Sequence, residues 1–170
     1  NTTSIGNTAV GALALNLSTG SNNTGLGCGS LRTNSTGNCN TAIGCGALFS
    51  NTTANDNTAI GLRSLYSNLT GASNTAMGKF SLCANTTASD NTAVGFCSLK
   101  ANTTGNDNTA LGSEAMKLTT TGTRNVGIGR NGLEANTTGG SNTAVGTNAL
   151  LLNTTASNNT AVGSSALSSN

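Results

Sequence analysis

Hydrophobic residues recur at two fixed points of a short repeat along this chain. Each repeat opens with the phrase N-T-A-[VIL]-G or a close variant, and a leucine or methionine follows the aliphatic residue after five positions. The opening asparagine, position 1 of the repeat, is Asn7, Asn23, Asn40, Asn57, Asn74, Asn91, Asn108, Asn125, Asn142 and Asn159. The first step between them is 16 residues and every later step is 17. Ten copies of so short a period indicate a solenoid.

The columns of this repeat differ in how much they vary. Position 4 is always large and apolar: Val10, Leu26, Ile43, Ile60, Met77, Val94, Leu111, Ile128, Val145 and Val162. Position 9 is Leu15, Leu31, Leu48, Leu65, Leu82, Leu99, Met116, Leu133, Leu150 and Leu167. Position 5 is always Gly, position 3 is only Ala or Gly, and position 8 is only Ala, Ser or Gly, whereas positions 6, 7, 10 and 11 vary freely.

These columns predict an all-β fold. Seventeen residues are too few for a helix pair, and Thr, Asn and Gly are poor helix formers. We therefore predict a parallel β-solenoid of ten coils of about 17 residues, each coil with two short strands. Coils spaced about 4.8 Å apart make a rod of roughly 48 Å. The whole span 1–170 forms one repeat domain, either a segment of a longer array or one filament unit.

Alternation along a strand decides which columns face inward. We expect position 4 to point into the coil, the threonine of position 2 to share its face, and position 3 to point outward. Because position 3 stays small, a second wall or another chain must pack against it. Two large side chains return about 3–6 kcal/mol against roughly 25 kcal/mol for ordering a coil. This balance favours another chain, in a homo-oligomer or a laterally supported filament. Stacked position 1 asparagines should form a hydrogen-bond ladder.

The repeat N-T-A-[VIL]-G-x-x-[AS]-L, followed by N-T-T-[AG], resembles the head repeats of trimeric autotransporter adhesins (YadA-like) and of phage tail-fibre and surface-fibre proteins. The match covers all ten coils, and Ala42-Ile43-Gly44 illustrates its core. The resemblance implies a left-handed β-roll, commonly trimeric, that serves as a rigid extracellular adhesive or spacer rod. Here the coil is longer by an N-T-T-rich turn, and five cysteines are unusual for that family.

Position 12 opens an N-x-[ST] sequon, the acceptor for N-glycosylation, in most coils. The sequon asparagines are Asn34, Asn51, Asn68, Asn85, Asn102, Asn136 and Asn153, with Asn1 and Asn16 in equivalent turns and the weaker, out-of-column Asn22 and Asn158. A polar turn, with Asn in a left-handed backbone conformation, explains the column without sugar. Alternatively, covalent N-glycans line one edge of the rod, keep it soluble and block sideways β-pairing. We take the glycans as the prediction.

The five cysteines are distributed unevenly over the coils. Cys28 and Cys45 both occupy position 6 of consecutive coils, where stacked Cα atoms about 4.8 Å apart lie within disulfide range. We predict a Cys28–Cys45 disulfide, with free thiols as the alternative. Cys39, Cys83 and Cys97 share no column, and their fate is left open. Because five is odd, at least one thiol is free or paired between chains.

Composition argues against catalysis. The chain has no His, five acidic residues and a net charge of +2, so there is no histidine for a triad or zinc site and no electrostatic case for nucleic acid. Asp56, Asp90 and Asp107 share position 17 but are too few ligands for calcium. Lys117 and Glu134 stack at position 10 as a surface ion pair. We predict no catalytic, metal or cofactor site, and no membrane span.

Three functions follow from these observations. The first is a structural subunit of an extracellular or surface fibre, N-glycosylated once per coil and self-associating as a homo-oligomer or head-to-tail filament. The second is an adhesin or phage tail-fibre head whose variable positions bind a cell-surface or glycan receptor. The third is ice binding through the threonine column, which an inward-facing threonine would argue against.

Overall fold

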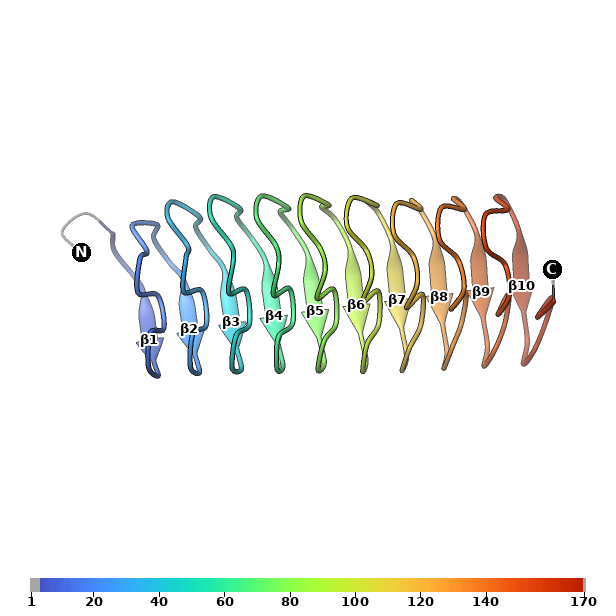
Figure 1. Ribbon diagram of the computed structural model, residues 1–170, viewed down its shortest axis with the longest axis horizontal. Coiled ribbons are helices and arrows are strands. Elements are labelled where there is room, and N and C mark those ends of the chain that lie inside the picture. The colour runs from blue at the N-terminus through green and yellow to red at the C-terminus, as the bar shows by residue number, and fades with distance from the viewer. Residues whose placement is uncertain (1–3, 170) are drawn as a thin grey trace.

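The chain is a rod of stacked coils with one short strand per coil (Figure 1). A computed structural model describes residues 4–169. The strands are β1 (Thr8–Val10), β2 (Thr24–Leu26), β3 (Thr41–Ile43), β4 (Thr58–Ile60), β5 (Thr75–Met77), β6 (Thr92–Val94), β7 (Thr109–Leu111), β8 (Val126–Ile128), β9 (Thr143–Val145) and β10 (Thr160–Val162). They form a single parallel sheet in sequence order. The predicted all-β parallel solenoid is confirmed. The prediction of a second strand in each coil is wrong, because the described residues contain one strand per coil.

Register follows from the repeat. Each residue pairs with the residue at the same position of the next coil, as in Thr41 with Thr58 and Ile43 with Ile60. The 16-residue first coil keeps this register, because Thr8 pairs with Thr24. Like residues therefore stack on like along the sheet, and every column of the sequence becomes a line along the rod.

The core of the coil contradicts the expected orientation of positions 3 and 4. The position 3 alanines from Ala42 to Ala144 are fully buried, whereas the position 4 residues are exposed or half-buried, with Val10 56% and Leu111 46% exposed. The interior is filled by the position 9 column, in which Leu31 to Leu150 are fully buried, as predicted. A Cβ on Gly25 would lie 3.3 Å from Cγ of Leu15. A leucine opposite leaves room at position 3 for a methyl group at most.

Glycine at position 5 is required by two constraints that act together. Gly61 has φ +130°, a region that L side chains avoid. A Cβ there would also lie 2.7 Å from the carbonyl carbon and oxygen of Gly78 in the next coil. The coils therefore approach each other through bare backbone at this corner.

Leucine at position 9 adopts a conformation that leucine ordinarily avoids. Leu65 has φ +49°, which costs roughly 1–2 kcal/mol for a non-glycine residue. Its amide donates to the Ser81 carbonyl of the next coil at 3.0 Å, and its side chain is fully buried. Burial and inter-coil pairing offset the strain, which is repeated in every coil.

The position 1 asparagines form the predicted ladder. Oδ1 of Asn40 accepts the backbone N–H of Asn57 at 3.0 Å, and Oδ1 of Asn57 accepts that of Asn74 at the same distance. Nδ2 of Asn57 donates to the Gly71 carbonyl at 2.9 Å. This column is fully buried from Asn23 to Asn142, so each amide replaces water for backbone groups inside the coil.

Candidate functional sites

The position 12 asparagines form a second buried ladder instead of a surface turn. Asn85 is fully buried. Its Nδ2 donates to Oδ1 of Asn68 at 2.8 Å and to the Ala88 carbonyl at 2.9 Å, and its Oδ1 accepts from Nδ2 of Asn102 at 3.1 Å. N-glycosylation would attach a sugar to this same Nδ2, and the buried ladder has no room for one. The structure therefore contradicts glycosylation at seven predicted sites: Asn34, Asn51, Asn68, Asn85, Asn102, Asn136 and Asn153.

The remaining sequons behave differently. Asn16 does not occupy the ladder, because Ser18 stands there and Nδ2 of Asn34 donates to its hydroxyl at 3.1 Å. Asn16, Asn22 and Asn158 are exposed, so burial does not oppose a sugar at any of these three. Asn1 lies outside the described residues.

The predicted disulfide is not formed. Cys28 and Cys45 are exposed free thiols, although their coils pair in register through the amide of Gly46 and the carbonyl of Cys28, 2.9 Å apart. Both side chains stand at the solvent-facing corner of the coil and not in its interior. Cys39 is also exposed, Cys97 is buried, and Cys83 is half-buried. Burial raises the pKa of the Cys83 thiol, against the lowering effect of Lys100 and Arg63.

The outer face of the sheet is the most regular surface of the molecule. Threonine at position 2 and the aliphatic residue at position 4 both point outward and flank the buried position 3, as in Thr75 and Met77 on either side of Ala76. Positions 2 and 4 hold no charged residue in any of the ten coils. We call these two columns the Thr-aliphatic face. It runs the length of the rod with a repeat of about 4.8 Å.

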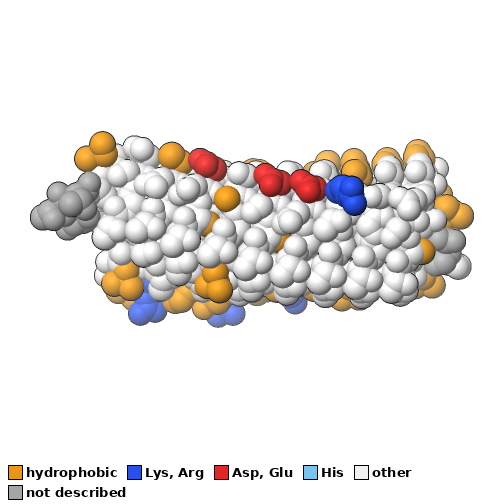
Figure 2. Space-filling model, turned by 90° about the horizontal axis from the view of Figure 1, so that it is seen from above, with side chains coloured by type: hydrophobic (Ala, Val, Ile, Leu, Met, Phe, Trp, Pro, Cys, Tyr) orange, Lys and Arg blue, Asp and Glu red, His pale blue; other side chains and the backbone are white. Residues whose placement is uncertain are grey.

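Charged residues lie at the edges of the rod. Figure 2 shows acidic side chains followed by a basic one in a line along one long edge, and basic side chains along the opposite edge. The first edge is position 17, with Asp56, Asp90, Asp107 and Arg124. The other edge is built from the variable positions 6, 7 and 10. Among the described residues, no cluster of three or more His, Cys, Asp or Glu side chains is placed to hold a metal ion.

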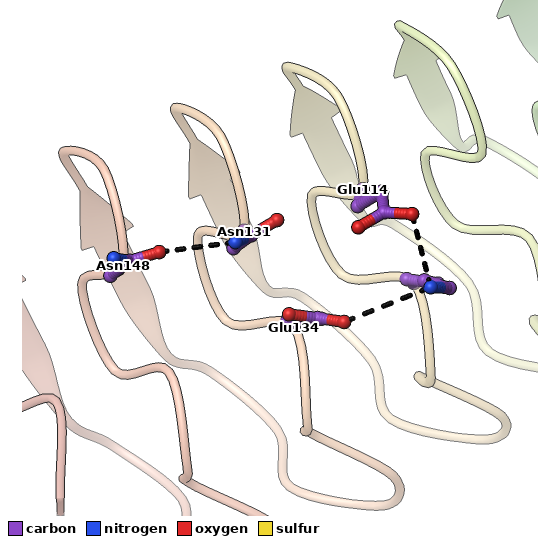
Figure 3. Close-up of polar contacts among 5 residues, drawn as sticks. Glu114, Asn131, Glu134 and Asn148 are labelled. Atoms are coloured by element: carbon purple, nitrogen blue, oxygen red, sulfur yellow. Dashed lines mark hydrogen bonds and ion pairs between the residues drawn. The ribbon is translucent and has the colours of Figure 1, made fainter.

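The variable edge contains the ion pair predicted at position 10. Nζ of Lys117 lies 3.9 Å from Oε1 of Glu134, which confirms the stacking. A shorter contact at 3.1 Å joins it to Glu114, which the sequence analysis missed because Glu114 stands at a different position of the same coil (Figure 3). The hydrogen bond to Glu114 raises the pKa of Lys117. Asn131 and Asn148 continue the row with a 3.1 Å hydrogen bond between their amides (Figure 3).

No protein-family model, curated protein or solved structure matches this chain. Residues 4–169 also contain no helix of the length and apolarity that a membrane crossing requires.

Proposed function

We propose that this chain is the structural subunit of an extracellular or surface fibre and that copies of it associate through the Thr-aliphatic face. The observation that carries the proposal is one uncharged column of ten aliphatic side chains, of which five are exposed and five half-buried. All charged residues of the chain stand at positions 6, 7, 10 and 17, along the two edges, and none interrupts this column.

The size and chemistry of the face suit a second copy of the same chain. A three-residue strand is about 10 Å long, so ten coils present roughly 480 Å². This area is comparable to the largest apolar patch on a typical monomer, and such patches commonly mark interaction sites. Because all coils carry the same columns, a parallel copy offers the same spacing and no charge to desolvate. Each added coil extends the contact, so association strengthens with length.

The interior arrangement favours a rigid rod. Two asparagine ladders, one of them interrupted at Thr119, and one column of leucines with Met116 run along the coils. Each coil is bonded to its neighbours through backbone and side-chain amides, so bending the rod breaks several buried hydrogen bonds together. A stiff, nearly uncharged rod suits a spacer or fibre shaft. The buried sequons remove the glycan coat from this proposal.

Self-association is tested by a charge on the face. Ile60→Asp places a carboxylate where the copies would meet, and burying it unpaired costs several kcal/mol. We expect analytical ultracentrifugation to show an oligomer for the parent and a monomer for Ile60→Asp. Thr53→Asp, at an exposed turn position, is the matched control and should stay oligomeric. A parent chain that is monomeric at high micromolar concentration would refute association through this face.

We infer ice binding as the second candidate, because the threonine column faces outward. Thr58 and its equivalents, replaced by Val126 in one coil, stand on the outer face of the sheet beside the aliphatic column, so the inward orientation that would have excluded this function is absent. Such an array offers hydroxyl and methyl groups at a regular spacing. A monomeric protein with thermal hysteresis that Thr75→Lys abolishes would select ice binding. An oligomer without thermal hysteresis would exclude ice binding and favour the fibre subunit.

A further inference from the structure

A cleft on the variable edge combines two aromatic rings with two guanidinium groups. It has a volume of about 170 Å³ and lies over the coils of β1 to β4. The rings of Phe49 and Tyr66 stack with centroids 5.0 Å apart and planes 17° apart. The guanidinium carbon of Arg32 lies 5.3 Å from the centre of the Phe49 ring, and that of Arg63 lies 5.3 Å from the Tyr66 ring.

Glycine makes room for this arrangement. Gly29 and Gly46 occupy position 7, where the other nearby coils have Leu13, Arg63 and Phe80. A Cβ on Gly29 would lie 3.3 Å from the ring of Phe49, and one on Gly46 would lie 3.3 Å from the ring of Tyr66. Each ring therefore rests against the bare backbone of the preceding coil. Gly29 and Gly46 stand in consecutive coils, and the coil that follows each of them has an aromatic residue, Phe49 or Tyr66, at position 10. The cleft lies where these two features coincide.

The positive charge of the cleft has no partner within residues 4–169. The ion pairs described there join Lys117 to Glu114 and Glu134, so neither Arg32 nor Arg63 contacts a carboxylate. Lys79 and Lys100 extend the basic row, each within 6 Å of the centre of the Phe80 ring. The aspartates of the same coils lie along the opposite edge (Figure 2). Guanidinium groups held over rings are oriented in advance and keep their N–H edges free.

We propose that this cleft binds an acidic saccharide, a sugar ring that carries a carboxylate or a sulfate, as part of a surface polysaccharide. The two guanidinium groups bind the anion through charge-assisted hydrogen bonds, and the Tyr66 hydroxyl at the edge of the stacked rings binds a sugar hydroxyl. A polymer with repeated charges also meets Lys79 and Lys100 along the rod, which adds binding through multivalency. The cleft thus gives the rod a specific adhesive contact.

The geometry favours a sugar over a nucleic acid base. Single-stranded nucleic acid binds by stacking bases on free aromatic faces. Here one face of Phe49 is covered by Tyr66 and each ring carries a guanidinium group. The hydroxyl of Tyr66 forms no hydrogen bond with any described residue and is free for a sugar hydroxyl.

The probes are oligogalacturonate, dextran sulfate, neutral dextran and a single-stranded oligonucleotide, measured by calorimetry against the full chain. Oligogalacturonate or dextran sulfate should bind, and the comparison of the two distinguishes carboxylate from sulfate. The double variant Arg32→Gln/Arg63→Gln should lose at least about tenfold in affinity. Arg124→Gln/Arg130→Gln removes the same charge away from the cleft and should change affinity less than about threefold. Equal losses in both double variants, binding of neutral dextran, or tighter binding of the oligonucleotide would overturn the proposal.

The cysteines supply a second, local readout. Cys28 and Cys45 line the cleft and are exposed, whereas Cys39 is exposed at position 17 on the opposite edge. A bound saccharide should slow maleimide labelling of Cys28 and Cys45 and leave that of Cys39 unchanged. Uniform rates at all three thiols under saturating saccharide would place binding elsewhere. The Ile60→Asp variant keeps this cleft, so failure of the saccharide proposal and failure of the fibre proposal are distinguishable.

Discussion

Thr119 interrupts the position 12 asparagine ladder, and an asparagine in its place should stabilise the rod. Thr119 occupies position 12 and is fully buried, but its Oγ1 has no hydrogen-bond partner. Oδ1 of Asn102, in the preceding coil, is also without a partner. Where the column is intact, the same Oδ1 accepts the amide of the next asparagine, as Asn68 does from Asn85 at 2.8 Å. The junction of these two coils therefore buries two unsatisfied oxygens.

The change Thr119→Asn supplies the missing amide. By analogy with Asn85, the new Nδ2 donates to Oδ1 of Asn102 and to the Gly122 carbonyl, and the new Oδ1 accepts from Nδ2 of Asn136. Each of these three hydrogen bonds contributes about 1 kcal/mol net. The lost methyl packing of threonine costs about 1 kcal/mol. The expected gain is about 2 kcal/mol in the free energy of unfolding.

Thermal and local measurements together check this prediction. At about 2–4 °C per kcal/mol for a chain of this size, Tm should rise by about 4–8 °C. Hydrogen exchange should slow most at amides in the coils that contain Asn102 and Asn136. Thr119→Val is the matched control: it removes the unpaired hydroxyl but offers no donor, so Asn102 stays unsatisfied and the gain should be under about 1 kcal/mol. If Thr119→Asn is neutral or destabilising, or no better than Thr119→Val, the ladder does not stabilise the fold as argued.

The other predictions concern the sequons, the position 5 glycine and the half-buried thiol of Cys83. Produced in a glycosylating host, the folded chain should carry no sugar at the ladder asparagines in peptide mass spectrometry, and glycan on most of them would refute the buried ladder. Gly61→Ala should cost several kcal/mol in urea unfolding, because of its positive φ and the Gly78 carbonyl 2.7 Å from the new Cβ. Gly140→Ala, which lacks the positive φ and whose Cβ would lie 3.2 Å from the Thr123 carbonyl oxygen, should cost less. Because burial raises the pKa of Cys83, its iodoacetamide rate should reach half-maximum at a higher pH than the rate of a small model thiol such as N-acetylcysteine. A pH profile that matches the model thiol would contradict this.

The sequence determined the number of coils, their register and the all-β class, because a 17-residue period with invariant glycine has few other solutions. It also determined the position 1 ladder, since identical amides spaced one coil apart are in hydrogen-bonding reach. The ion pair of Lys117 with Glu134 followed from the same stacking.

Only the tertiary structure decided which face of each strand is inside. Hydrophobicity favoured Ile60 as the core residue and Ala59 as the surface residue, yet Ala59 is fully buried and Ile60 is only half-buried on the outer face. The leucine at position 9, bent inward by a left-handed backbone conformation, already fills the coil and leaves space for a methyl group only. The same closure buries Asn68 and its equivalents, although N-x-[ST] is the same string whether its asparagine faces water or carbonyl groups. The space inside a coil depends on how the whole repeat closes on itself, so it cannot be read from any single residue of the repeat.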